Sequence, residues 1–140
     1  MPYVSVGGDS HRIYYKIRGD SDAPIKIVRS FVRRFERKRE FNRKFQKQVF
    51  TMGLGGDHYM WKPQIDYFSK RPAEFQTLVY DNRGVGFSDH VSGRFTTRGM
   101  AQDAIDVMDH LGWTSNVHLI GLSMGGMITQ EIAKLDLPRF

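Results

Sequence analysis

One serine of this sequence has neighbours that suit covalent chemistry. Ser123 lies within Gly121–Gly126, a Gly-Leu-Ser-Met-Gly-Gly segment that fits the pattern G-x-S-x-G between an apolar run and a helix-like run. In this pattern the serine occupies a strained turn that projects its hydroxyl, and glycines let the strand and the helix approach without Cβ clashes. The N-terminus of the following helix directs amide N–H groups toward a developing oxyanion. The segment predicts a serine nucleophile; a glycine-rich phosphate-binding turn is the alternative interpretation.

Two further segments that contain glycine follow strand-like runs and precede the serine. Met52–Gly56 (Met-Gly-Leu-Gly-Gly) separates a strand-like run from a helix-like run, which is the position expected for a second backbone donor to an oxyanion. Asp81–Ser88 (Asp-Asn-Arg-Gly-Val-Gly-Phe-Ser) follows the next strand-like run. Together with the serine segment they form three ordered turns.

The elements that must position these turns are predicted from hydrophobic periodicity. Two short β-forming runs separated by Gly7–Ser10 predict an antiparallel hairpin. After it, strand-like and helix-like runs alternate, which indicates parallel strands, crossover helices and an α/β fold. The predicted strands are Tyr3–Val6, Ile13–Ile17, Ile25–Val28, Val49–Met52, Phe75–Tyr80 and Asn116–Ile120. The predicted helices are His58–Lys70, Thr97–Leu111 with Thr97 as its cap, and Met127–Leu135.

The three turns resemble those of the α/β-hydrolase superfamily, in its lipase, esterase, lactonase and haloperoxidase-like branch, where HG-x-G, D-x-R-G-x-G-x-S and G-x-S-x-G occur in this order. The resemblance implies a serine hydrolase that acts on an ester, lactone or related small acyl substrate, without a cofactor or metal. It implies that Ser123 is the nucleophile and that the backbone amides of Leu54 and Met124 form the oxyanion hole. Met52 stands where the family commonly has histidine. Structural support, with the Asp81 turn bracing the nucleophile loop, is implied for Gly53, Asp81, Arg83, Gly121 and Gly125.

A serine nucleophile needs a general base that is itself oriented by a carboxylate. In the family the chain order is serine, acid and then histidine, but the 17 residues after Ser123 contain Glu131, Asp136 and no histidine. We therefore expect a truncated α/β-hydrolase fold, the N-terminal half of a longer enzyme, that is inactive alone. His58, beside the Gly53 loop, is the alternative base. All five histidines precede the nucleophile: His11, His58, His90, His110 and His118.

A basic segment interrupts the predicted sheet. Nine basic and two acidic residues lie between Arg29 and Gln48, and the rest of the chain is nearly neutral. Because Ile25–Ile27 joined to Val49–Met52 would make one continuous strand, we expect residues 28–48 to be an insertion into a single domain of residues 1–140. A retained intron is one possible origin of this segment. Introns begin with GT and end with AG, Val28 is encoded by a codon that begins with GT, and Gln48 can be encoded by CAG.

The competing interpretation makes the basic segment functional. Phe31, Phe35, Phe41 and Phe45 would form an aromatic stripe on a cationic helix that binds nucleic acid or an anionic membrane surface. The protein would then be a non-catalytic relic or an interaction module with a hydrolase-like fold. If the segment is not genuine, we expect no nucleic-acid partner.

Composition restricts the class of protein further. The chain has 140 residues, of which 40% are hydrophobic and 26% charged, as in one globular domain with a real core. No apolar run reaches the roughly 18 residues of a membrane span, and no signal-peptide pattern is present. With no cysteine, disulfides, thiolate metal sites and a cysteine nucleophile are excluded. This composition fits a reducing compartment, and we expect a cytoplasmic location.

Overall fold

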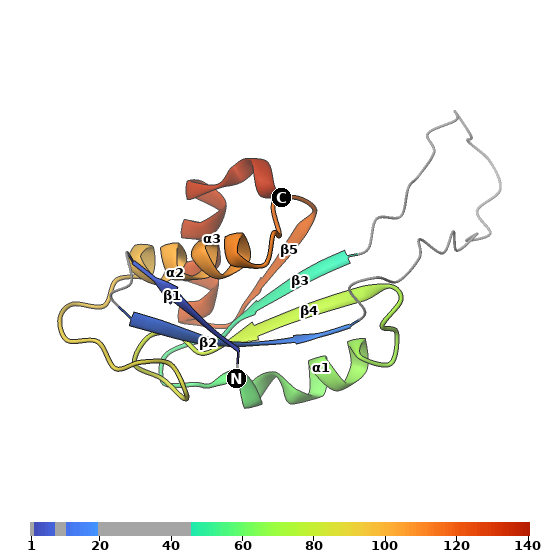
Figure 1. Cartoon of the computed structure of the whole chain (residues 1–140), viewed down its shortest axis with the longest axis horizontal. Helices are drawn as coiled ribbons and strands as arrows, with labels where there is room; N and C mark the ends of the chain where they lie inside the picture. The colour runs from blue at the N-terminus through green and yellow to red at the C-terminus, as the bar shows by residue number, and fades with distance from the viewer. Residues whose placement is uncertain (1, 8–10, 20–45) are drawn as a thin grey trace.

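Five strands form one sheet, and helices cover both of its faces, in the computed structural model (Figure 1). The structure describes residues 2–7, 11–19 and 46–140. In chain order the strands are β1 (Tyr3–Val6), β2 (His11–Arg18), β3 (Gln46–Thr51), β4 (Phe75–Tyr80) and β5 (Val117–Gly121). The α-helices are α1 (Lys62–Phe68), α2 (Thr97–His110) and α3 (Met124–Leu135), and the 3-10 helices are η1 (His58–Trp61) and η2 (Leu137–Arg139).

The strand order is β1-β2-β4-β3-β5, with β3 in the centre of the parallel part. Val49 of β3 faces Leu78 of β4 on one side and Leu119 of β5 on the other, and both pairings are parallel. The predicted hairpin of β1 and β2 is confirmed as antiparallel, and β2 joins it to β4 in antiparallel register. The α/β fold class is therefore confirmed, with parallel pairing confined to β4, β3 and β5.

Crossovers in opposite directions place helices on opposite faces of the sheet. The chain moves from β3 to β4 through α1, and then back past β3 to β5 through α2. Since parallel crossovers are almost always right-handed, the reversal of direction puts α1 on one face and α2 on the other, together with α3 (Figure 1). A larger apolar cluster fills the face under α2 and α3, and a smaller one around Phe50, Trp61 and Val79 lies under α1.

Helix boundaries differ from the predicted ones for local reasons. The predicted helix His58–Lys70 is divided into η1 and α1, because Pro63 stands in the first turn of α1 and cannot donate to the preceding turn. Thr96 caps α2 through its hydroxyl, which accepts from the Gly99 amide at 3.0 Å, so the predicted cap at Thr97 was one residue late. In the described part of the chain, no helix combines the length and the apolar character that crossing a bilayer requires.

The central strand begins three residues earlier than predicted. Gln46, Lys47 and Gln48, which the sequence assigned to the insertion, are the first residues of β3 and pair with β4. Gln48 is buried, and no group in the described part of the chain hydrogen bonds to its Oε1. The predicted strand Ile25–Val28 and the remainder of the basic segment lie outside the described residues.

Candidate active site

The three turns singled out in the sequence meet at one edge of the sheet. β3, β4 and β5 are parallel neighbours, so their carboxyl ends share an edge, where ligands commonly bind in sheets of this kind. Gly53 and Leu54 follow β3 within the Met52–Gly56 loop. The aspartate turn (Asp81–Ser88) follows β4, and the serine turn (Gly121–Gly126) ends β5 and begins α3.

Ser123 occupies a strained backbone position with an exposed side chain. Its φ of 54° and ψ of −124° lie in a region that non-glycine residues rarely adopt. Helix α3 begins at the very next residue, Met124, and not at Met127 as predicted, so the hydroxyl stands at the positive end of the helix dipole. This is the conformation in which a strand-to-helix turn presents a serine hydroxyl above a sheet.

Two glycines allow the close packing that holds the serine turn. A Cβ on Gly125 would collide with the carbonyl oxygen of Thr51 and lie 2.9 Å from that of Met52. A Cβ on Gly121 would collide with the carbonyl oxygen of Gly125 and lie 2.5 Å from its carbonyl carbon. The Leu122 amide also donates to the Thr51 carbonyl at 3.1 Å. The turn is thus fixed against the end of β3 by backbone contacts that a side chain at either glycine would prevent.

The loop after β3 lies directly against the serine. A Cβ on Gly53 would lie 3.1 Å from the Ser123 Cβ and 3.6 Å from its Oγ. Leu54 is the next residue, and its side chain is 85% exposed. Neither the Leu54 amide nor the Met124 amide donates a hydrogen bond to any acceptor in the described ranges. The loop contributes one unengaged backbone donor, the Leu54 amide, and the start of α3 contributes the other, the Met124 amide.

Asn82 supports this loop, although nothing in its local sequence pattern marked it as a functional residue. Its Nδ2 donates to the Met52 carbonyl at 3.0 Å, and the side chain is buried. Its Oδ1 has no partner among the residues that the structure describes. Met52 itself is buried in the cluster under α1. The only available signal was a polar amide directly after a buried strand, in a place where buried polar groups need partners.

Asp81 organises the aspartate turn from within the protein. It is almost fully buried, and its carboxylate accepts from the His58 amide at 2.7 Å, from His58 Nδ1 at 2.9 Å and from the Phe87 amide at 3.0 Å. Since a carboxylate only accepts hydrogen bonds, Nδ1 carries the proton. The His58 ring packs beside Tyr14, whose pKa is raised because burial disfavours its phenolate. Asp81 therefore ties the start of η1 to the end of β4.

Arg83 reaches a different element. Its Nε and Nη2 donate to the Asp103 carboxylate of α2 at 2.6 and 2.5 Å, and Nη2 also lies 3.2 Å from the Gly99 carbonyl. His11 Nε2 lies 3.2 Å from the same carboxylate. The sequence assigned Asp81 and Arg83 to support of the nucleophile loop. Their hydrogen bonds hold η1 and α2, and Asn82 braces the Gly53 loop.

The surroundings of the Ser123 hydroxyl bear on which residue could act as its base. No hydrogen bond joins the Ser123 hydroxyl to another residue within the described ranges. His58, the alternative base, has an exposed fraction of 4%, its Nδ1 is engaged by Asp81, and its Nε2 is buried without a partner. His118 is exposed on β5 and His110 ends α2. Within the described ranges the structure brings together the serine, Gly53 and Leu54, and no histidine hydrogen bonds to the serine.

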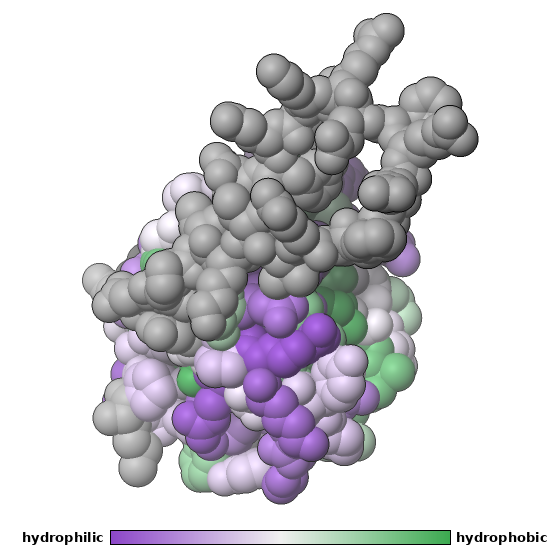
Figure 2. Space-filling view, turned by 90° about the vertical axis from the view of Figure 1, so that its right-hand side faces the viewer, coloured by the Kyte–Doolittle hydropathy of each residue, from purple (hydrophilic) through white to green (hydrophobic). Residues whose placement is uncertain are grey.

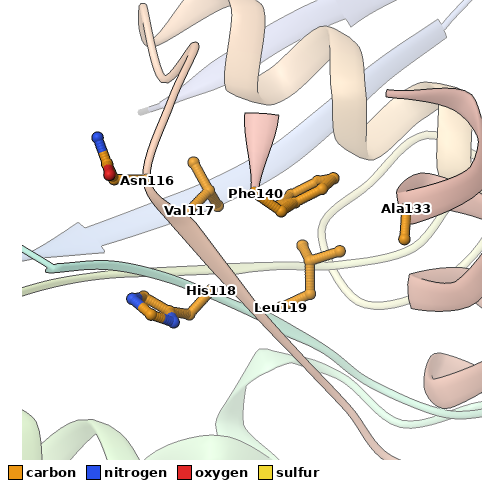
Figure 3. Close-up of a pocket in the computed structure, with 6 residues that line it drawn as sticks. All are labelled: Asn116, Val117, His118, Leu119, Ala133 and Phe140. Carbon is orange, nitrogen blue, oxygen red and sulfur yellow. The ribbon is translucent and has the colours of Figure 1, made fainter. Parts of the chain in front are cut away.

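A shallow hollow of about 410 Å³ lies along the outer edge of β5 (Figure 3). His118 points away from its neighbours Val117 and Leu119, and Phe140 lies near Val117 (Figure 3). The hollow is separate from the serine turn, because none of its lining residues belongs to that turn. It marks the free side of the last described strand.

Comparison with known proteins agrees with this geometry. Residues 49–138 match the family model described as the alpha/beta hydrolase fold. The chain is 33% identical over 92 residues to 3-oxoadipate enol-lactonase 1 of Acinetobacter baylyi, which covers 66% of this chain and 33% of that protein. The crystal structure of the enol-lactonase from Burkholderia xenovorans LB400 superposes with a TM-score of 0.76 and 28% identity, over 99% of this chain and 44% of that one. A malate-bound esterase from Thermogutta terrifontis, at 23% identity and a TM-score of 0.73, shares the fold. The chain thus spans less than half the length of these relatives.

Proposed function

Because the chain belongs to the alpha/beta hydrolase fold family, we propose that Ser123 is the nucleophile of a hydrolase that acts on an ester, lactone or related acyl compound. The observation that carries this proposal is the backbone of Ser123, with φ of 54° immediately before α3 and the Gly53 loop in contact with it. The names of relatives include enol-lactonases and an esterase, and these support an acyl substrate.

The proposed reaction uses the groups at this edge of the sheet. The Ser123 Oγ attacks the substrate carbonyl carbon, and its proton passes to a base. The carbonyl oxygen becomes an oxyanion that accepts from the amides of Leu54 and Met124, which have no other described acceptor. The oxyanion then re-forms the carbonyl, the C–O bond of the leaving group breaks, and the base returns its proton to the leaving oxygen. Water hydrolyses the acyl-serine, which releases the acid and restores the hydroxyl.

We further propose that residues 1–140 alone turn over slowly. No described side chain hydrogen bonds to the Ser123 hydroxyl, and the two buried histidines, His58 and His11, are already engaged by Asp81 and Asp103. Removal of the base and its orienting acid leaves only the contribution of the oxyanion hole, which amounts to about 10³- to 10⁴-fold over water in well-studied hydrolases.

The test is covalent labelling of the 140-residue chain by a fluorophosphonate, mapped by mass spectrometry, with and without added imidazole as an external base. Ser123 should be labelled selectively, and imidazole should accelerate the labelling. Ser123→Ala should abolish it, whereas Ser115→Ala, which removes another exposed serine, should not. Labelling spread over several serines and indifferent to Ser123→Ala would refute the nucleophile.

Hydrolysis of p-nitrophenyl acetate tests the second part of the proposal. We expect slow hydrolysis that Ser123→Ala reduces only slightly. Enzyme-like rates without added base, lost in Ser123→Ala, would show that the described chain contains a base, and His58 would be the first residue to examine. Absence of both labelling and hydrolysis, even with imidazole, would favour the non-catalytic interpretation.

A further inference from the structure

A second cavity lies under the face of the sheet that α1 covers. It encloses about 180 Å³ between the outer part of β2, one residue of β4 and the segment that contains η1 and α1. Its walls are formed by Lys16, Arg18, His58, Tyr59, Lys62, Ile65, Asp66 and Val79. Register explains the arrangement, because Lys16 stands opposite Val79 and Arg18 opposite Thr77, so that alternate residues of β2 face the cavity.

The cavity carries uncompensated positive charge. Lys62 is paired with Asp66 one helical turn later. Within the described ranges, no carboxylate forms an ion pair with Lys16 or Arg18. Lys16 is only partly exposed, so its charge is less screened than that of a fully solvated lysine. Figure 2 looks onto the end of the sheet at which β2 ends, where a large hydrophilic area borders an apolar one.

One wall of the cavity contains a buried polar group without a partner. His58 Nδ1 donates to Asp81, and no described group hydrogen bonds with the buried Nε2. Because Nδ1 carries the proton, Nε2 is an acceptor, so a water or the P–OH group of a monohydrogen phosphate can satisfy it and an unprotonated phosphate oxygen cannot. In the described ranges Asp81 forms no ion pair with the lysine or the arginine, and its carboxylate already accepts from two backbone amides and the imidazole.

We propose that this cavity binds a small oxyanion of the phosphate class, held by the guanidinium of Arg18 and the ammonium of Lys16. A guanidinium offers a planar pair of donors that matches two oxygens of a tetrahedral anion, and an ammonium adds a third donor. Inorganic phosphate and the phosphoryl group of a small phosphate ester share this chemistry. The exposed ring of Tyr59 beside the cavity leaves room for the organic part of such an ester.

This site is independent of the serine turn. β2 and β5 are three strand spacings apart in the order β2-β4-β3-β5, which is about 14 Å. None of the lining residues belongs to the Gly53 loop or to the serine turn. Anion binding can therefore be measured whether or not Ser123 is catalytic.

The experiment is an NMR titration of the 140-residue chain with inorganic phosphate at constant ionic strength, with chloride as the compensating anion. Saturable shifts of the amides of Lys16, Arg18 and Lys62 are expected. In Lys16→Gln/Arg18→Gln the affinity should fall by about tenfold or more, since two charge-assisted hydrogen bonds are lost. The matched control Arg98→Gln/Lys134→Gln removes the same charges from exposed positions on α2 and α3, and its affinity should stay within about twofold.

A parallel titration with phenyl phosphate distinguishes the two sources of the anion. Tighter binding than that of inorganic phosphate identifies an ester as the ligand, and equal binding identifies free phosphate; both outcomes support the site. Absence of saturable shifts in the unmodified chain would rule the site out, even if the double variant fails to fold. An equal loss of affinity in the two double variants would show that phosphate binding depends only on the overall charge of the chain. That result would also rule out the site.

Discussion

The serine turn and the aspartate turn end parallel strands at the same edge of the sheet, but different contacts hold them. The serine turn depends on backbone atoms and on the missing side chains of Gly121 and Gly125. The aspartate turn depends on buried side chains, since Asp81, Asn82 and Arg83 each hydrogen bond to a different segment. Adding a side chain should therefore destabilise the serine turn, whereas removing a side-chain partner should destabilise the aspartate turn.

The largest expected effect comes from the ion pair of the aspartate turn. Asp103→Asn leaves the Arg83 guanidinium, whose side chain is 17% exposed, without its bidentate partner. Loss of one partner from a buried pair costs about 3–5 kcal/mol of unfolding free energy, measured by urea denaturation. Asp106→Asn, three residues later in α2, removes a carboxylate in an exposed setting and should cost less than about 1 kcal/mol. Equal losses in both variants would contradict a special role for the buried pair.

The serine turn should fail when a single methyl group is added. Gly125→Ala places a Cβ against the carbonyl oxygen of Thr51, backbone that has no room to move, and should cost about 3 kcal/mol or more. Gly126→Ala is the matched control, because the nearest atom to its Cβ is 3.8 Å away. A helical glycine that becomes alanine should be neutral or stabilising by up to about 1 kcal/mol. The same urea series measures both, and similar stabilities would refute the packing account.

The strand that both turns share, β3, offers a test of the insertion. Deletion of residues 28–48 would place Ile27 where Gln48 now stands and would remove its buried, unpartnered Oε1. We expect the deletion to raise the unfolding free energy by about 2 kcal/mol and to increase solubility, without restoring turnover. Gln48→Ile in the intact chain isolates the side-chain part of the effect. A deletion variant that is less stable than the parent would argue that the segment is a genuine part of the fold.

A smaller effect is expected at the link between the aspartate turn and the Gly53 loop. Asn82→Ala leaves the Met52 carbonyl without its donor but also removes the orphaned Oδ1, so the net loss should be about 1 kcal/mol. Gln102→Ala breaks a bond of similar length on the surface, to Asp106 at 2.9 Å, and should change stability by only a few tenths of a kcal/mol. Fluorophosphonate labelling of Ser123 should also slow in Asn82→Ala if Asn82 orients the loop that carries the Leu54 amide. Unchanged labelling would limit Asn82 to a purely structural role.

The smallest effect concerns the outer end of the aspartate turn. The hydrogen bonds from Arg12 hold the pKa of Asp89, just after this turn, below its ordinary value of 3.8. A carboxyl with a lowered folded-state pKa contributes stability above the ordinary value, and this contribution disappears as pH falls through the lowered pKa. Thermal unfolding of the unmodified chain and of Arg12→Gln should therefore differ slightly near neutrality and converge in acid. A difference that persists in strong acid would show that Arg12 acts through something other than this pair.

The sequence predicted those features that depend on local patterns. The bounds of β4 were predicted correctly, because Phe75–Tyr80 is an almost uniformly buried run bounded by polar turns. The start of α3 was predicted three residues late, because Gly125 and Gly126 were interpreted as turn residues although both are helical. Glycine is present at position 125 to permit close packing against β3, and this requirement is visible only when Thr51 lies beside it.

The candidate site likewise contains some features that the sequence predicts and others that only the tertiary structure decides. The serine, its flanking glycines and the order of the three turns follow from residue types at short spacing, and sequence alone determined them. The partners of Asp81, Asn82 and Arg83, and the burial of His58, were decided only by the tertiary structure. The bonds from Asp81 to His58, from Asn82 to Met52 and from Arg83 to Asp103 join residues 20 or more positions apart. The physical reason is that such a bond depends on which strands are neighbours and on which face each helix lies, and a buried polar group takes whichever partner that arrangement places within reach.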